Sequence, residues 1–333
     1  MRVIFLGNKS SSLSNERFNI LNSFDFVKEI YYMDIVKEEK LLKKIISYFN
    51  KLIILNYLIL FKKYDYVIYH GAYHFILSLI CSKKTKVIVI VQGSEINEQY
   101  KKQVKFFVKK LLYRSNLIIT RSLNMKKNII NKISRIEKKI EIINWGINDV
   151  YFASNIKKYD DKITIISYRA TGKIYNIDLI FNVIEKLKLK YHNINFIYVE
   201  YNKDYMVNLN LDIVDEYYKT MTKQQLASIL AKVDISLSIP TYDGFSNSIL
   251  ESLASGCYPL ISNIDAYSLV FPNDDKLLRK INVEFDSFYK SLEDLIHNID
   301  IVRGNKIYRR EFAKSNYDRK NQIDILKQRI INI

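Results

Sequence analysis

The chain has 333 residues, of which 48% are hydrophobic and 26% are charged. This composition is typical of a soluble globular protein, and the length allows two domains with cores of their own. The longest apolar run, residues 52–61, is about half of the roughly 20 residues that a membrane-spanning helix needs. The first residues predict a short strand and no cleavable signal peptide. We expect Cys81 and Cys257 to be reduced core thiols, and no spacing typical of metal ligands occurs.

The net charge of +17 lies almost entirely in the first half of the chain. Residues 1–150 contain 27 Lys and Arg against 12 Asp and Glu, whereas residues 151–333 contain 25 against 23. Such asymmetry favours a polyanion or an anionic membrane surface as the partner of the first half. A lysine-rich face that is merely solvated is the alternative.

Short apolar strands alternate with helices in both halves. Strands are predicted at residues 2–6, 27–32, 66–69, 86–91, 117–120, 140–143, 164–167, 195–200, 235–239 and 258–262. Helices are predicted at residues 15–23, 37–63, 75–80, 100–113, 123–131, 178–191, 222–232, 247–255, 287–298 and 310–330. Strands separated by helices imply an α/β fold with parallel, doubly wound sheets.

The most informative stretch is PTYDGFSNSILESLASGCYPLIS, residues 240–262. An apolar strand runs into a turn that Asp243 opens and that Gly244 allows to bend, and a helix follows. The free N–H groups and the positive dipole end of a helix start favour an anion at such a turn. Arg169 and the stretch 92–95 also follow strands, and ligands of open α/β sheets bind at the carboxyl ends of strands.

The run DGFSNSILESLASGCYP, residues 243–259, resembles the signature of the family 4 retaining glycosyltransferases. That signature pairs two acidic residues with seven between them, here Asp243 and Glu251, and ends in Gly-x-Pro, here varied as Gly256-Cys257-Tyr258-Pro259. Aspartate replaces the commoner first glutamate and keeps the carboxylate. The segments 144–152, 167–187 and 222–240 also resemble the family, whereas the first half resembles it only in its rhythm and in VQGSE, residues 91–95.

The resemblance implies a GT-B fold, which is two facing Rossmann-like domains with parallel sheets and an interdomain cleft. Residues 1–150 plus 316–333, with a C-terminal crossover helix, would form the acceptor-side domain. Residues 151–315 would form the domain that binds the nucleotide-sugar donor.

The resemblance also implies the catalytic residues. Asp243 would bind hydroxyl groups of the transferred sugar, and Arg169 would neutralise the donor diphosphate. A surface charge and a turn residue are the plainer interpretations of these two positions. Lys173 is close to the place of the second cation that the family uses and is assigned to donor binding.

Donor binding is assigned to the helix start and to one residue inside the helix. Glu251 would bind the ribose hydroxyls, with a solvated helix charge as the alternative. The backbone of Gly244, Phe245, Ser246 and Asn247 would approach the diphosphate. No metal and no cofactor is implied, because the nucleotide-sugar is a substrate.

The acceptor side is predicted at Gln92, Gly93, His70 and His74. Many relatives have a histidine at the place of Gln92, which can donate a hydrogen bond but cannot titrate. A structural role is an equally open interpretation of the two histidines. A retaining transfer of the front-face kind needs positioning and charge stabilisation, and no strong base.

The sequence therefore predicts a retaining, metal-independent glycosyltransferase. It would move a hexose-type sugar to a lipid-linked glycan, with a polyprenyl diphosphate as the carrier, in bacterial surface polysaccharide (O-antigen or capsule) synthesis. The basic segments 37–63 and 100–113 would attach it to the cytoplasmic face of the membrane. The alternatives are a GT-B nucleotide-sugar epimerase or hydrolase, and a basic nucleic-acid-binding protein, although no nucleic-acid motif occurs.

Overall fold

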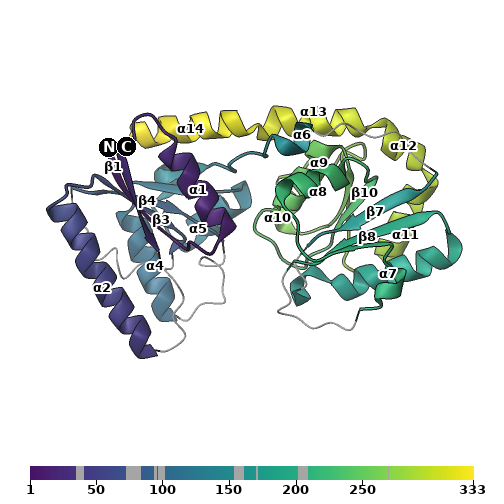
Figure 1. Cartoon of the computed structure of the whole chain (residues 1–333), viewed down its shortest axis with the longest axis horizontal. Coiled ribbons are helices and arrows are strands. Elements are labelled where there is room, and N and C mark those ends of the chain that lie inside the picture. Colours follow the sequence, from purple (N-terminus) through teal and green to yellow (C-terminus); the bar gives the residue numbers. More distant parts are fainter. Residues whose placement is uncertain are drawn as a thin grey trace. The chain divides into compact units, whose positions relative to one another are not determined.

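The computed structural model describes residues 1–34, 41–72, 84–93, 96, 102–153, 161–169, 172–201, 209–268 and 270–333. The predicted helix at 75–80, His74 and Cys81 lie outside these residues. The chain forms two compact units (Figure 1). The first unit comprises Met1–Asn144 with Ile323–Ile333, and the second comprises Trp145–Gln322.

The first unit is built on a six-stranded sheet with the order β2-β1-β3-β4-β5-β6, in which every pair of neighbours is parallel. Its strands are β1 (Arg2–Gly7), β2 (Glu29–Asp34), β3 (Tyr66–His70), β4 (Lys86–Ile90), β5 (Leu117–Thr120) and β6 (Ile140–Ile142). Its described helices are α1 (Ser12–Asn22), α2 (Leu41–Leu60), α4 (Lys102–Arg114), α5 (Leu123–Lys132) and the 3₁₀ turn η2 (Glu137–Lys139).

Helices cover the sheet of the first unit, so its strands read as continuous apolar runs. On one face, Val67 and Tyr69 of β3 belong to the same core as Leu55 of α2, Leu111 of α4 and Ile129 of α5. None of the described helices is long and apolar enough to cross a membrane.

The second unit repeats the architecture with the order β12-β11-β10-β7-β8-β9, again parallel throughout. Its strands are β7 (Ile163–Ser167), β8 (Ile194–Val199), β9 (Glu216–Tyr218), β10 (Ile235–Ser238), β11 (Tyr258–Ser262) and β12 (Arg279–Ile281). Its helices are α6 (Val150–Ala153), α7 (Ile177–Lys190), α8 (Lys223–Leu230), α9 (Asn247–Ser255), α10 (Asp265–Ser268), α11 (Phe285–His297), α12 (Ile299–Gly304) and α13 (Lys306–Tyr317), with the 3₁₀ turns η3 (Lys173–Tyr175) and η4 (Leu211–Ile213). The α/β fold with parallel, doubly wound sheets is confirmed.

The predicted helix at 310–330 is wrong, because two helices replace it. The first is α13 and the second is α14 (Arg319–Ile331). Between them Asp318 has an extended backbone, with φ −57° and ψ 128°, and forms a parallel bridge with Ile147. The Asp318 carboxylate then accepts from the Asn321 N–H at 3.0 Å and caps the new helix. The break therefore comes from a contact with a distant segment.

Some boundaries and short elements also differ from the prediction. Helix α1 begins at Ser12, before the predicted start at residue 15, because the Ser11 hydroxyl accepts from the Ser14 N–H and caps it. The short elements β9, α10, β12 and α12 were not predicted. At the start of α8, Thr222 and Gln225 form a reciprocal capping box.

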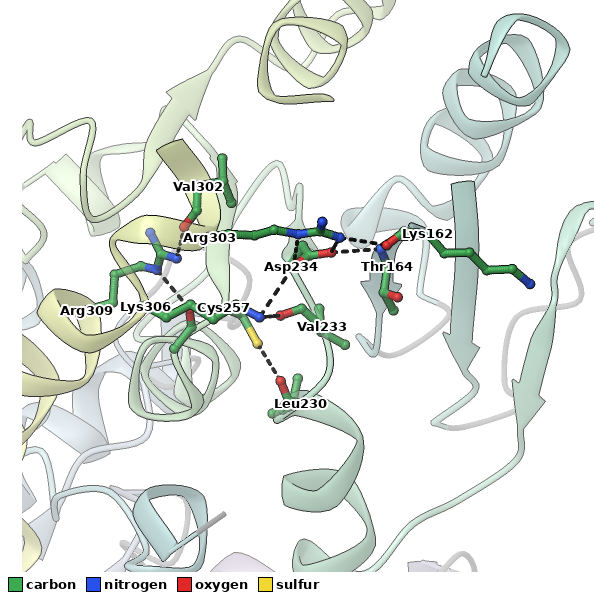
Figure 2. A network of polar contacts seen from close by, with 11 residues as sticks. Lys162, Thr164, Leu230, Val233, Asp234, Cys257, Val302, Arg303, Lys306 and Arg309 are labelled. Carbon is green, nitrogen blue, oxygen red and sulfur yellow. Dashed lines mark hydrogen bonds and ion pairs between the residues drawn. The ribbon is translucent and has the colours of Figure 1, made fainter. Parts of the chain in front are cut away.

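A buried charge cluster fixes the amino end of β10 (Figure 2). Asp234, which is 2% exposed, accepts from the Arg303 guanidinium at 2.9 and 3.1 Å and lies 3.4 Å from the Lys306 ammonium. Its carboxylate also accepts from the Thr164 N–H of β7 at 3.1 Å. The two cations and the backbone N–H compensate the cost of burying the Asp234 carboxylate. The cluster therefore connects α12 and the start of α13 to the two central strands of the second sheet, β7 and β10.

Candidate functional site

The site lies at the carboxyl ends of β7 and β10, which are neighbouring parallel strands. Arg169 follows β7, and the turn that contains Asp243 follows β10. Because parallel strands end at the same edge of a sheet, the two segments meet there although 74 positions separate the two residues. The sequence prediction that these residues lie at one edge is confirmed in its geometry, while their roles remain predictions.

The Arg169 guanidinium is the centre of this cluster. Its Nη2 donates to Asp243 Oδ2 at 2.6 Å, and its Nη1 donates to the hydroxyls of Ser246 and Ser248 at 2.7 and 2.8 Å. The ring of Tyr175 lies against it at 4.6 Å from the guanidinium carbon. Its Nε is buried and has no hydrogen-bond partner among the described residues. A planar cation held this way is suited to bind an anionic oxygen.

The charge of Arg169 is maintained by its neighbours. Burial is the largest single influence and opposes the charge, but the Asp243 carboxylate, together with Tyr267 and Tyr175, raises the pKa of the guanidinium above its ordinary value. Burial raises the pKa of Tyr267 as well, and the adjacent Asp243 charge acts in the same direction. Tyr267 therefore stays protonated, and its hydroxyl donates to Asp243 Oδ2 at 2.8 Å.

The first turn of α9 faces the same cluster. Ser246 is the N-cap residue, yet its side chain makes no capping bond to the helix, because its hydroxyl accepts from Arg169 and contacts the Ser248 hydroxyl at 2.8 Å. Phe245 and Ser246 are buried, whereas Asn247 is exposed. The Gly244 N–H donates to Asp243 Oδ1 at 2.7 Å and shapes the turn. The positive end of the α9 dipole thus lies beside a cation, which favours a negatively charged ligand.

Glu251 lies one to two turns into α9 and is partly buried. Its charge raises the pKa of two tyrosines that burial already raises, Tyr168 and Tyr201, the latter to about 12. The Tyr168 hydroxyl donates to the backbone carbonyl of Ser248 and lies 2.8 Å from the Ser252 hydroxyl, which fixes α9 against the end of β7. A polar carboxylate beside aromatic rings is suited to a ribose and its base.

The predicted second cation, Lys173, begins η3 and is exposed. No hydrogen bond or ion pair of its side chain occurs among the described residues. Tyr175 of the same turn contacts Arg169 instead. The turn is fixed by Asn176, which donates to the Ile239 carbonyl at 2.6 Å, and by the Thr241 N–H, which donates to Ile174 at 2.8 Å.

The predicted acceptor side belongs to the first unit. His70 ends β3, and its Nε2 lies 3.2 Å from the Gln92 Nε2 just after β4. Gly93 follows with a φ of +108°, which a residue with a side chain rarely adopts. These three residues meet because β3 and β4 are parallel neighbours. Predicted residue His74 lies outside the described residues.

Sequence reasoning missed three tyrosines that lie beside Arg169, Asp243 or Glu251, namely Tyr175, Tyr267 and Tyr201. The chain has 26 tyrosines, so tyrosine at these positions carries no signal by itself. Only the spatial adjacency to Arg169, Asp243 and the segment of Glu251 singles them out. Among the described residues, no group of three or more His, Cys, Asp and Glu side chains is placed to hold a metal ion.

No protein-family profile matches the chain, and no curated protein matches it by sequence. Solved structures do. HepE from Anabaena, in complex with UDP and glucose, matches over 100% of both chains with a TM-score of 0.78 and 10% identity. Sucrose-phosphate synthase from Thermosynechococcus elongatus matches over 98% of both chains with a TM-score of 0.79 and 9% identity.

A glycosyltransferase from Rickettsia africae matches over 100% of this chain and 99% of its own, with a TM-score of 0.76 and 13% identity. At such low identity the likeness concerns the fold. The two parallel sheets with interleaved helices match those of GT-B proteins. The chain therefore has the two-domain α/β fold known as GT-B.

Proposed function

We propose that this protein is a glycosyltransferase that takes a sugar from a nucleoside diphosphate bound in the second unit. The observation that carries the proposal is the Arg169 guanidinium, held between Asp243 and the start of α9 with a buried Nε that has no partner among the described residues. A cation beside the positive end of a helix stabilises the negative charge that develops on a leaving diphosphate. The resemblance of residues 243–259 to family 4 retaining enzymes supports the same assignment.

The roles within the donor site are proposed, with support from the geometry and from that resemblance. Arg169 would bind the diphosphate together with the backbone from Gly244 to Asn247, with Lys173 as a second cation. Glu251 would accept from the ribose hydroxyls, and Asp243 would accept from a hydroxyl of the sugar. Retention would follow if the acceptor oxygen bonds to the anomeric carbon on the same face from which the diphosphate departs, while a departing phosphate oxygen takes the acceptor's proton and Arg169 stabilises the negative charge.

The donor class is proposed with support from the similar structures. HepE has been solved with UDP and with UDP-glucose, so UDP-sugars are the first donors to test. The acceptor would be a lipid-linked glycan of bacterial surface polysaccharide synthesis, and His70, Gln92 and Gly93 would face it. The protein would work at the cytoplasmic face of the membrane, attached through the basic first half.

The test measures nucleoside diphosphate released from a panel of nucleotide-sugars, with and without lipid-linked acceptor. We expect release that depends on the acceptor. Glu251→Gln removes a charged hydrogen-bond acceptor from the ribose and should raise the Kd of the nucleoside diphosphate about tenfold to a hundredfold. Glu284→Gln, at an exposed N-cap of the same unit, is the matched control and should change nothing.

Two results would contradict the proposal. Turnover of the nucleotide-sugar at the same rate without acceptor would indicate an epimerase or hydrolase. Binding of no nucleoside diphosphate at millimolar concentration, measured as no rise in the melting temperature, would remove the donor site altogether.

A further inference from the structure

The Asp243 carboxylate has little capacity left for a ligand. Its Oδ2 accepts from Arg169 at 2.6 Å and from the Tyr267 hydroxyl at 2.8 Å, and its Oδ1 accepts from the Gly244 N–H at 2.7 Å. A carboxylate offers about four acceptor positions. One position on Oδ1 therefore remains, which is enough for one sugar hydroxyl.

The ion pair with Asp243 also uses part of the hydrogen-bonding capacity of the Arg169 guanidinium. Nη2 points to a carboxylate, and Nη1 points to two hydroxyls that are weaker acceptors than an anionic oxygen. A diphosphate at the start of α9 would be the second anion on one cation. The Asp243 carboxylate and the phosphate would then compete for Nη2. The side chains of Arg169 and Asp243 are only 12% and 16% exposed, so little water is present to screen the repulsion between the two anions.

We propose that Arg169 and Asp243 form a resting ion pair that opens when a nucleoside diphosphate binds, and that Tyr267 holds the Asp243 carboxylate while Arg169 turns to the phosphate. This exchange of partners rests on the proposed function and assigns Tyr267 as a positioning residue. Tyr267 acts through Asp243, and its role is to keep Oδ1 of that carboxylate aimed at the sugar after the ion pair has opened.

Tyr267 is suited to this role by its burial. It lies in α10, is 1% exposed, and its ring packs edge-on against Phe271 with the ring centroids 6.1 Å apart. A side chain fixed on all sides keeps its hydroxyl in place when a neighbour moves. Arg169 differs, because a long flexible side chain with Tyr175 against its face can rotate towards a new anion.

The proposal predicts opposite changes in UDP affinity for variants of Asp243 and of Tyr267. Asp243→Asn keeps the shape and removes the competing charge, so the Kd for UDP should fall about tenfold while sugar transfer is lost. Tyr267→Phe removes the holder of the displaced carboxylate, so the Kd for UDP should rise roughly threefold to tenfold. In the Asp243→Asn background, Tyr267→Phe should have no effect, because there is no charge to hold.

The experiment is calorimetric titration of the full chain with UDP, with the unliganded melting temperature as the measure of folding. Tyr308 and Asp274 form a matched control, since the Tyr308 hydroxyl donates to an Asp274 oxygen at the same 2.8 Å elsewhere in the second unit. Tyr308→Phe and Asp274→Asn should leave the UDP affinity unchanged.

Outcomes separate this proposal from the proposed function. If the wild type binds UDP and Asp243→Asn binds it equally or more weakly, the exchange is overturned and the donor site stands. An equal effect of Tyr267→Phe in both backgrounds would reduce Tyr267 to a structural residue and would overturn its role. If UDP and the other nucleoside diphosphates all fail to bind the wild type, both proposals fall together.

Discussion

Arg169 and Asp234 are buried charges at opposite ends of two neighbouring parallel strands. Arg169 follows the carboxyl end of β7, whereas Asp234 precedes the amino end of β10. Asp234 is saturated by two cations and a backbone N–H, which is the pattern of a structural ion cluster. Arg169 keeps a buried Nε without a partner among the described residues. The difference in saturation, rather than the presence of charge, distinguishes the proposed binding site from the structural cluster.

Replacing Asp234 should destabilise the protein strongly. Asp234→Asn leaves the cations of Arg303 and Lys306, whose side chains are 13% and 3% exposed, without their counter-charge. The free energy of unfolding should fall by about 3 kcal/mol or more, because an uncompensated buried charge is costly. Denaturant unfolding of the wild type and the variant measures this change.

Asp294→Asn is the control for this prediction. Its partner Arg279 lies at only 2.6 Å, but the two side chains are 52% and 27% exposed, so solvent screens the pair. We expect a loss below about 1 kcal/mol. Equal losses in the two variants would mean that burial does not determine the contribution of these ion pairs.

At the scale of elements, the junction of α9 and β11 sets the position of helix α9. Gly256 follows α9 with a φ of +88°, and its N–H donates to the Leu253 carbonyl at 3.0 Å. A Cβ at this position would lie 3.3 Å from both Lys306 Cβ and the Lys306 carbonyl oxygen. The glycine is therefore needed for its backbone conformation and for the close approach of α13.

Gly256→Ala should consequently lower the stability by about 1–2 kcal/mol from the left-handed conformation alone. The melting temperature should fall by a few degrees, and the contact with Lys306 would add to the loss. Gly304→Ala is a matched control within the same unit, because a Cβ there meets no atom within 4 Å and the residue ends a helix. A larger loss for Gly304→Ala than for Gly256→Ala would contradict this account.

The longer strands of the two sheets and the longer helices between them could be predicted, because the pattern of apolar residues within each segment is enough to identify it. The approach of Arg169 to Asp243 followed from the rule that ligand-binding residues lie at the carboxyl ends of parallel strands. Helix α10, which carries Tyr267, could not be predicted, because four residues show no periodicity. The break at Asp318 depends on its bridge with Ile147, a contact that no local pattern encodes.

At the scale of the whole molecule, nearly all of the net positive charge lies in the first half of the sequence, and helix α2 of that half exposes a row of apolar side chains. One face of α2 exposes Ile46, Phe49, Ile53, Tyr57 and Leu60, each between 50% and 63% exposed and three or four positions apart. The opposite face packs into the core through Leu55, Leu58 and Ile59. Exposed lysines follow the helix at 62 and 63. If the proposed membrane attachment holds, this apolar stripe with lysines at its carboxyl end is the surface that we expect to enter an anionic lipid interface.

This surface leads to a prediction for vesicle binding. The full chain should co-sediment with vesicles that contain anionic lipids and should bind neutral vesicles much more weakly. Raising the salt concentration from about 0.15 to 1 M should release the protein, because salt screens the attraction between lysines and lipid headgroups. The double variant Phe49→Ser and Ile53→Ser should weaken binding by on the order of tenfold or more, because two apolar side chains no longer enter the interface.

The control is a double variant that removes equally exposed apolar side chains from the second unit. Ile301 and Ile307 are 63% and 64% exposed, so Ile301→Ser with Ile307→Ser removes a similar apolar area. If both double variants lose binding equally, the α2 stripe is not the attachment surface. If salt has no effect and neutral vesicles bind as well, the positive charge of the first half has another partner. Retained binding in the control, with loss in the α2 variant, would assign attachment to one helix face in the half that carries the charge.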